Sequence, residues 1–170
     1  MKRRVIIITR LSWDEYFLEI MRKVGERSTC DRGKPGSVIV KDNRIIATGY
    51  AGSPTGLPHC DDEGHILRNV LQDDGTIRQH CVRTIHAEQN AICQAARFGI
   101  SLEGSTLYLK FTPCPVCAKM IINSGIKRIV AEKGYHGVYE TPDLFKRAGI
   151  RFEIINPEIE KYDNMQITKS

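Results

Sequence analysis

The sequence lacks the features that mark membrane, fibrous and disordered proteins. Its 170 residues contain no internal repeat and no low-complexity tract, and hydrophobic residues make up 41% of them, which is typical of a soluble globular chain. The longest early apolar run, residues 5–8, is far shorter than the roughly 20 residues of a transmembrane helix. No small-residue cleavage site follows it, as it would in a signal peptide. We therefore expect one domain over residues 1–170, a cytoplasmic location and no membrane partner.

A strong charge of one sign is also missing. The chain has 25 lysines and arginines against 20 acidic residues, for a net charge of +5. The basic residues form no concentrated stripe of the kind found in dedicated nucleic-acid binders. This balance fits an anionic small molecule as a partner, or simply a solvated surface.

Cysteine, by contrast, is present six times. Without an export signal, these residues indicate metal binding or catalysis rather than disulfides. Cys114 and Cys117 form a C-x-x-C pair, while Cys30, Cys60 and Cys81 are scattered upstream. Cys93 lies in an alanine-rich run, where we expect it to be a small core residue.

Hydrophobic periodicity in the first half predicts a helix over residues 12–28 and a hairpin over residues 37–50. Ser12 and Glu15 form a capping box at the start of the helix, and Asp42 and Asn43 supply the hairpin turn. The next stretch, about residues 51–82, is rich in Gly, Pro and Asp. We expect an irregular insertion there, which a metal could order.

The second half alternates helices and strands. We expect helices over residues 85–98, 115–125 and 141–149, the last with Thr141 as its N-cap, and strands over residues 105–111, 126–131 and 150–155. Such alternation favours an α/β fold with helices on both faces of a sheet that is parallel in its last strands. The polar tail, about residues 157–170, is expected to be partly disordered or docked on a partner subunit.

Two of these helices begin with residues that bind metals. His86 and Glu88 open one helix, and Cys114 and Cys117 open the next. A helix N-terminus favours the thiolate form that zinc requires. One nitrogen and two sulfurs leave the fourth position of a tetrahedral zinc open, as in catalytic sites, and Glu88 is placed to move protons. The spacing H-x-E…P-C-x-x-C is the signature of zinc nucleobase deaminases.

On these residues the sequence resembles the deoxycytidylate (dCMP) deaminases of the zinc-dependent cytidine deaminase superfamily, in particular the competence-associated bacterial type. The likeness covers about residues 12–155 and is carried by STCDRGKPGSVIV, GYAGSPTGLPHCDDEGH, HCVRTIHAEQNAI, STLYLKFTPCPVCAKMIINSGIKRIV and LFKRAGI. It implies a three-layer α/β/α fold with a mixed five-stranded sheet. It also implies that His86, Cys114 and Cys117 hold zinc, that zinc-bound hydroxide attacks C4 of the pyrimidine, and that Glu88 protonates N3 and the leaving amine.

Further Cys and His residues are not used by this site. They are Cys30, Cys60, His65, His80 and Cys81. Similar deaminases often carry a second, structural zinc, and the likeness implies Cys30, Cys60, His65 and Cys81 as its ligands. His80 is the main rival of Cys81, because adjacent residues seldom both face one ion, and His59 is a weaker candidate.

The same likeness implies a small-molecule nucleotide substrate and a homo-oligomer, either hexamer or dimer. It also implies dCTP and dTTP as allosteric effectors, with Mg²⁺ accompanying the regulatory nucleotide. Tyr135 matches the aromatic residue that packs over the base. Ala51 replaces the usual asparagine of G-Y-N-G, so substrate identity and regulation stay open. Four cations are either phosphate binders or solvated surface residues, namely Arg27, Arg32, Lys34 and Lys110.

Two alternatives remain. One is a deaminase acting on a base in nucleic acid or on a modified nucleotide, and it is disfavoured by the missing basic stripe and the extra cysteines. The other is a non-catalytic zinc scaffold or nucleotide sensor, which would not need the proton-transfer group Glu88.

Overall fold

The computed structural model describes residues 10–71, 75–135, 140–159 and 167–168. Five helices occur in this part of the chain: α1 (Trp13–Gly25), α2 (Cys60–Glu63), α3 (Ala87–Arg97), α4 (Pro115–Asn123) and α5 (Thr141–Arg147). The strands are β1 (Gly36–Lys41), β2 (Arg44–Tyr50), β3 (Leu67–Leu71), β4 (Ile77–Cys81), β5 (Thr106–Phe111), β6 (Arg128–Gly134), β7 (Arg151–Ile159) and β8 (Ile167–Thr168). None of the described helices combines the length and apolar character needed to cross a bilayer.

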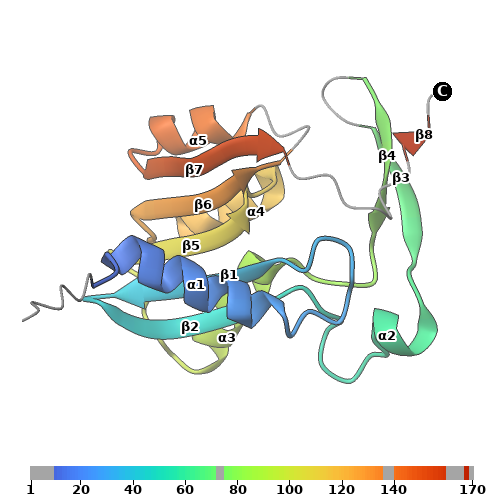
Figure 1. Cartoon of the computed structure of the whole chain (residues 1–170), viewed down its shortest axis with the longest axis horizontal. Helices are drawn as coiled ribbons and strands as arrows, with labels where there is room; N and C mark the ends of the chain where they lie inside the picture. The colour runs from blue at the N-terminus through green and yellow to red at the C-terminus, as the bar shows by residue number, and fades with distance from the viewer. Residues whose placement is uncertain (1–9, 72–74, 136–139, 160–166, 169–170) are drawn as a thin grey trace, which may run out of the picture.

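Five strands form the central sheet, in the order β2-β1-β5-β6-β7 (Figure 1). Strand β1 is antiparallel to both of its neighbours, whereas β5, β6 and β7 run parallel. The predicted mixed sheet with parallel last strands is thus confirmed. The parallel strands are joined by α4 and α5, because parallel neighbours need a long crossover connection, which is usually a helix.

Apolar side chains on both faces of the sheet account for the three layers. Phe17 and Met21 of α1 pack with Val38 and Tyr108 on one face. On the other face the core joins α3, α4 and α5 to alternate residues of the same strands, such as Ile39 and Leu107. Because successive side chains of a strand point to opposite faces, β1 is buried on both sides and reads as a continuous apolar run.

The sequence predicted an irregular insertion, and this prediction was wrong. The insertion contributes two strands to a small sheet of its own. Strands β3 and β4 form an antiparallel hairpin, and β8 pairs with β4. This sheet stands beside the main one, with α2 at its base (Figure 1). Within the predicted tail, residues 157–159 extend β7 and residues 167–168 form β8, while residues 160–166 and 169–170 lie outside the described part. The hairpin was missed because every residue of β3 is exposed, so its sequence shows no buried alternation.

Two local predictions were wrong. Thr141 is the first residue of α5 rather than its N-cap, which is Glu140. The buried Thr141 hydroxyl instead donates a hydrogen bond to the Pro113 carbonyl (3.0 Å). Cys93 is exposed rather than part of the core, because the buried face of α3 follows Ala87, Ala91 and Ala95 at four-residue spacing.

A network of charges ties α1 to the parallel strands. The Arg128 guanidinium donates hydrogen bonds to both carboxylate oxygens of Asp14 (2.8 and 2.7 Å) and to Glu153 (2.8 Å). The Tyr108 hydroxyl also donates to Asp14 (2.7 Å). Hydrogen bonding to Arg128 lowers the pKa of Asp14 and of Glu153 below their ordinary values.

This network predicts a stability loss in acid. A carboxyl group whose pKa is lower in the folded than in the unfolded chain contributes stability above its unfolded pKa, near pH 4. That contribution disappears as the pH falls through the folded pKa. Asp14→Asn should therefore lower the free energy of unfolding at pH 7, by about 1 kcal/mol or less because both carboxylates are partly exposed. At pH 3 it should have a smaller effect, as measured by urea unfolding.

The exposed residue Glu19 on the same helix provides the control. Glu19→Gln should leave unfolding unchanged at both pH values. An equal loss of unfolding free energy for Asp14→Asn at pH 7 and pH 3 would contradict the link between the lowered pKa of Asp14 and stability.

Candidate metal centre and active-site pocket

The first candidate metal group is built by two helix N-termini. His86 is the N-cap of α3 and Cys114 is the N-cap of α4, where Pro115 occupies the first turn. Helix α3 is held close to the sheet because the Ser37 hydroxyl donates to the Ala87 carbonyl (2.8 Å). A side chain at Gly49 would collide with that same carbonyl, so glycine is required for the close approach.

The donor atoms of His86, Cys114 and Cys117 lie within 4.8 Å of one another. His86 Nδ1 is 3.7 Å from Cys114 Sγ and 3.3 Å from Cys117 Sγ. A tetrahedral zinc with ordinary bond lengths separates such donor atoms by about 3.5–3.8 Å. The group therefore fits a zinc ion with one coordination position left over.

Electrostatics within this group favour a cation. The hydrogen bond between the two cysteines and the nearby His86 lower the pKa of Cys114 to about 4, against the effect of burial. The contact with Cys114 raises the pKa of His86 to about 9. The pKa of Cys117 is raised by the adjacent Cys114 sulfur and by burial. A divalent cation would remove the repulsion between two adjacent thiolates, and binding would then release protons.

Glu88 lies in the first turn of α3 and is buried, with 8% of its surface exposed. Its Oε1 is 3.9 Å from His86 Nδ1. The residue is not part of the metal group but lines the pocket beside it. A carboxylate in this position can reach a molecule bound at the metal without being a ligand itself.

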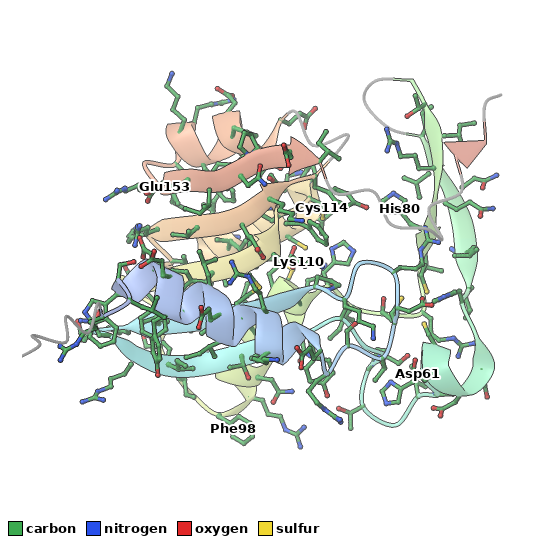
Figure 2. All side chains as sticks on the ribbon, viewed as in Figure 1. Asp61, His80, Phe98, Lys110, Cys114 and Glu153 are labelled. Atoms are coloured by element: carbon green, nitrogen blue, oxygen red, sulfur yellow. The ribbon has the colours of Figure 1, made fainter. Side chains whose placement is uncertain are left out.

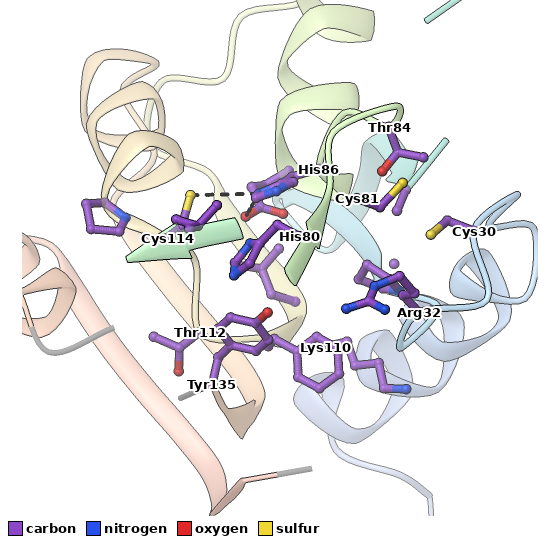
Figure 3. Close-up of a pocket in the computed structure, with 18 of the residues that line it drawn as sticks. Cys30, Arg32, His80, Cys81, Thr84, His86, Lys110, Thr112, Cys114 and Tyr135 are labelled. Atoms are coloured by element: carbon purple, nitrogen blue, oxygen red, sulfur yellow. Dashed lines mark hydrogen bonds and ion pairs between the residues drawn. The ribbon is translucent and has the colours of Figure 1, made fainter. Parts of the chain in front are cut away.

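A cavity of about 360 Å³ opens in front of this group, a size suited to a small ligand. Its walls come from the ends of β1 and β5, the hairpin and Tyr135 after β6 (Figure 3). His80 on the hairpin and Cys114 and Lys110 of the main body all border this cavity (Figures 2 and 3). Ala51 and Tyr135, predicted from the sequence, are among the lining residues.

A second group of four donors lies at the base of the hairpin. It consists of Cys30, Cys60, His65 and Cys81, whose donor atoms also lie within 4.8 Å of one another. Cys30 Sγ is 3.7 Å from His65 Nδ1, and Cys60 Sγ is 3.6 Å from Cys81 Sγ. These separations again match a tetrahedral zinc, here with all four positions taken by the protein.

The surroundings of the second group raise one thiol pKa and lower another. Burial raises the pKa of Cys60 to about 12. For Cys81 burial acts in the same direction, but hydrogen bonds from the Arg83 backbone and from His65 outweigh it and lower the pKa to about 7. His65 Nε2 lies 3.0 Å from an Asp31 oxygen. A carboxylate partner on the far ring nitrogen fixes the orientation of a metal-binding histidine.

The two rival ligands lie elsewhere. His80 lines the active-site pocket, and burial lowers its pKa. Neighbouring residues of a strand point to opposite faces, so Cys81 faces the second group while His80 faces the cavity. His59 Nδ1 is 3.0 Å from the Thr29 hydroxyl oxygen.

Comparison with known proteins agrees with this geometry. Residues 11–133 match the model of the cytidine and deoxycytidylate deaminase zinc-binding region. The chain belongs to this deaminase family. The predicted membership of the deoxycytidylate deaminase family is therefore confirmed, and the zinc-binding character of the family supports zinc as the metal.

Several relatives of this deaminase chain cover most of its length. ComE operon protein 2 of Bacillus subtilis is 41% identical over 144 residues, which are 85% of this chain and 71% of the relative. Deoxycytidylate deaminase of Mycobacterium phage D29 is 40% identical over 129 residues, 74% of this chain and 98% of the relative. The dCMP deaminase of cyanophage S-TIM5, solved in complex with dCMP and dUMP, has a TM-score of 0.68 and 27% identity, covering 86% of this chain and 98% of that one.

Some residues of the deaminase pocket were not singled out from the sequence. They include Val70, Leu71, Gln79, Thr84, Phe111 and Thr112. Thr84 stands two residues before His86, and Thr112 stands two residues before Cys114. Their proximity to the two motifs was therefore a usable signal. The hairpin residues offered none, because only the fold of the insertion brings them to the pocket.

Proposed function

We propose that this chain is a zinc-dependent deoxycytidylate deaminase, a hydrolase that converts dCMP to dUMP and ammonia. The observation that carries the proposal is the buried Glu88 beside the His86, Cys114 and Cys117 group, in the wall of a cavity of about 360 Å³. Relatives named deoxycytidylate deaminase, and the cyanophage enzyme solved with dCMP and dUMP, support this substrate.

In this mechanism His86, Cys114 and Cys117 hold the zinc. When bound, zinc acts as a Lewis acid and lowers the pKa of a water molecule. Glu88 takes a proton from the attacking water and delivers it to N3 as the C4–O bond forms. Glu88 then moves the second proton from the new hydroxyl to the amine. The C4–N bond breaks, ammonia leaves and the C4 carbonyl forms.

Burial suits Glu88 to this task. A carboxylate shielded from bulk water exchanges protons with the substrate rather than with solvent. Its place in the first turn of α3 also sets its Oε1 3.9 Å from His86 Nδ1, beside the metal group. Both features follow from how α3 packs against β1 and β2.

We further propose that Cys30, Cys60, His65 and Cys81 bind a second, structural zinc. The support is the closed set of four donors and the small contribution of apolar burial to the stability of the hairpin. No residue between positions 60 and 81 belongs to the two hydrophobic clusters of the described chain. A metal site can supply the folding free energy that such a segment cannot obtain from burial.

Tyr135 and Ala51 are proposed substrate contacts. The Tyr135 ring lies 5.7 Å, centroid to centroid, from the Phe111 ring, so a base in the pocket can pack against an aromatic pair. Ala51 offers only a methyl group. Its carbonyl accepts hydrogen bonds from the Ser28 hydroxyl (2.8 Å) and the Thr29 amide (3.1 Å), which fix this wall of the pocket.

The likeness to the family supports several proposals about the protein as a whole. These are a single domain over residues 1–170, a homo-oligomer (hexamer or dimer), regulation by dCTP and dTTP with Mg²⁺, and a cytoplasmic location. Because Ala51 replaces the asparagine of relatives, regulation should be tested separately from catalysis, by adding dCTP or dTTP with Mg²⁺ to the assay below.

The function is tested by measuring ammonia release from dCMP, dCTP, cytidine, deoxycytidine and single-stranded DNA. We expect the highest kcat/KM for dCMP, the nucleotide for which relatives such as the phage deaminases are named. Ammonia from none of the free nucleotides would refute the proposal and favour the scaffold alternative. Faster release from single-stranded DNA would favour the nucleic-acid alternative.

A further inference from the structure

Two cations in the pocket have no part in the deamination mechanism. The sequence singled out Arg27, Arg32, Lys34 and Lys110 as candidate phosphate binders. Of these, Arg32 and Lys110 line the cavity and are half-buried, whereas Arg27 and Lys34 are exposed and lie outside the lining. The tertiary structure therefore divides four equivalent candidates into two pairs.

The two pocket cations meet on one loop. Arg32 lies on the loop between α1 and β1 and donates a hydrogen bond to the backbone oxygen of Gln79 on β4 (2.7 Å). Lys110, at the end of β5, donates to the backbone oxygen of Gly33 (2.7 Å). Gly33 follows Arg32 directly and has a φ of 77°, a conformation that glycine adopts readily, and its carbonyl ties the loop to β5 through Lys110. Both positive charges are thereby held at the same wall.

This wall lies opposite the reacting end of the pocket. Figure 3 shows Cys114 on one side of the cavity and Arg32 and Lys110 on the other. A nucleotide with its base at the metal group must place its 5′-phosphate away from that group, because base and phosphate stand at opposite ends of the sugar. The position of the two cations matches this requirement.

The chemistry of the contacts points the same way. Gln79 and Gly33 offer neutral carbonyl oxygens, whereas a phosphate monoester is an anion with several acceptor oxygens. Hydrogen bonds between a cation and an anion are roughly twice as strong as those to neutral acceptors. A phosphate at this wall is therefore a stronger acceptor for both cations than these two carbonyls.

We propose that Arg32 and Lys110 form an anion subsite that binds the 5′-phosphate of the substrate and selects nucleotides over nucleosides. The inference rests on the proposed function and assigns the phosphate end of the same site. A nucleoside, which lacks the phosphate, gains nothing from this wall.

The test compares dCMP with deoxycytidine in four proteins: wild type, Arg32→Gln, Lys110→Met and Lys34→Met. Losing a hydrogen bond to a charged group should raise KM for dCMP about 10- to 100-fold in the first two variants. The dCMP/deoxycytidine ratio of kcat/KM should fall by at least about tenfold. Lys34→Met is the matched control, because this exposed lysine lies on the same loop, and its ratio should equal that of wild type.

Arg32→Gln keeps a donor for the Gln79 carbonyl, so the loop can stay in place. Circular dichroism and zinc content check that each variant folds. An equal loss of kcat/KM for dCMP and deoxycytidine would overturn the proposal, since it would indicate a structural effect. An unchanged ratio would overturn it as well.

A binding measurement separates this inference from the proposed function. Calorimetry with dUMP and deoxyuridine requires no turnover. Tighter binding of dUMP that is lost in Arg32→Gln would support the subsite even if wild type released no ammonia from dCMP. Wild-type deamination of dCMP together with equal affinity for dUMP and deoxyuridine would overturn the subsite alone.

Discussion

Replacing Glu88 with glutamine is expected to lower kcat for dCMP by about three orders of magnitude while the zinc content stays unchanged. General acid and base catalysis contributes about 10²–10⁴-fold in enzymes, and here one carboxylate serves both proton transfers. Glutamine keeps the size of the buried side chain but cannot accept and release the proton. The measurement is ammonia release under saturating dCMP, with metal content determined by atomic emission.

Glu19→Gln, on the exposed face of α1, is the matched control and should retain the wild-type kcat. A kcat within about tenfold of wild type for Glu88→Gln would be inconsistent with the assigned role. Such a small loss of kcat lies below the usual contribution of general acid and base catalysis. Loss of zinc from Glu88→Gln would instead mean that the carboxylate supports the metal group.

Replacing Cys60 with serine is expected to remove one of two zinc ions per chain and to lower Tm by on the order of 10 °C. Structural zinc contributes about 10–16 kcal/mol in small zinc-binding peptides, and a few kcal/mol shift Tm by about 10 °C in a chain of this size. The exposed strand β3 and the small helix α2 have few buried side chains to compensate. Amide hydrogen exchange should show lost protection over residues 66–71 and 77–81.

Cys93→Ser provides the control, because Cys93 is an exposed cysteine on α3 that belongs to neither donor group. It should keep two zinc ions and the wild-type Tm. Two zinc ions per chain in Cys60→Ser would rule out the second metal site as assigned. Unchanged exchange in the hairpin, after the metal had been lost, would show that the segment is held by other contacts.

Local chemistry made several elements predictable from the sequence. Ser12 and Glu15 form the predicted capping box of α1, and Asp42 and Asn43 take up the positive φ values of the hairpin turn. The motifs around His86 and Cys114 work in the same way, since each places its metal-binding residues at the start of a helix. Such features depend on residues within a few positions of one another, so the sequence displays them directly.

The sequence could not reveal how the insertion folds. The hairpin is held together by strand pairing and borders the second donor group, and neither feature produces a buried alternation in β3. For the same reason the choice between His80 and Cys81 stayed open. It depends on which face of β4 each residue takes, and only the register of that strand decides this.

What the sequence alone determined about this protein is its family, its main sheet and the donors of the first metal group, because each is encoded in short motifs and hydrophobic periodicity. What only the tertiary structure decided is which of those residues share a site. Four potential donors from three separate segments converge at the base of the hairpin, and two of four candidate cations line the pocket. Such convergence depends on contacts between residues far apart in the chain, and no local pattern records it.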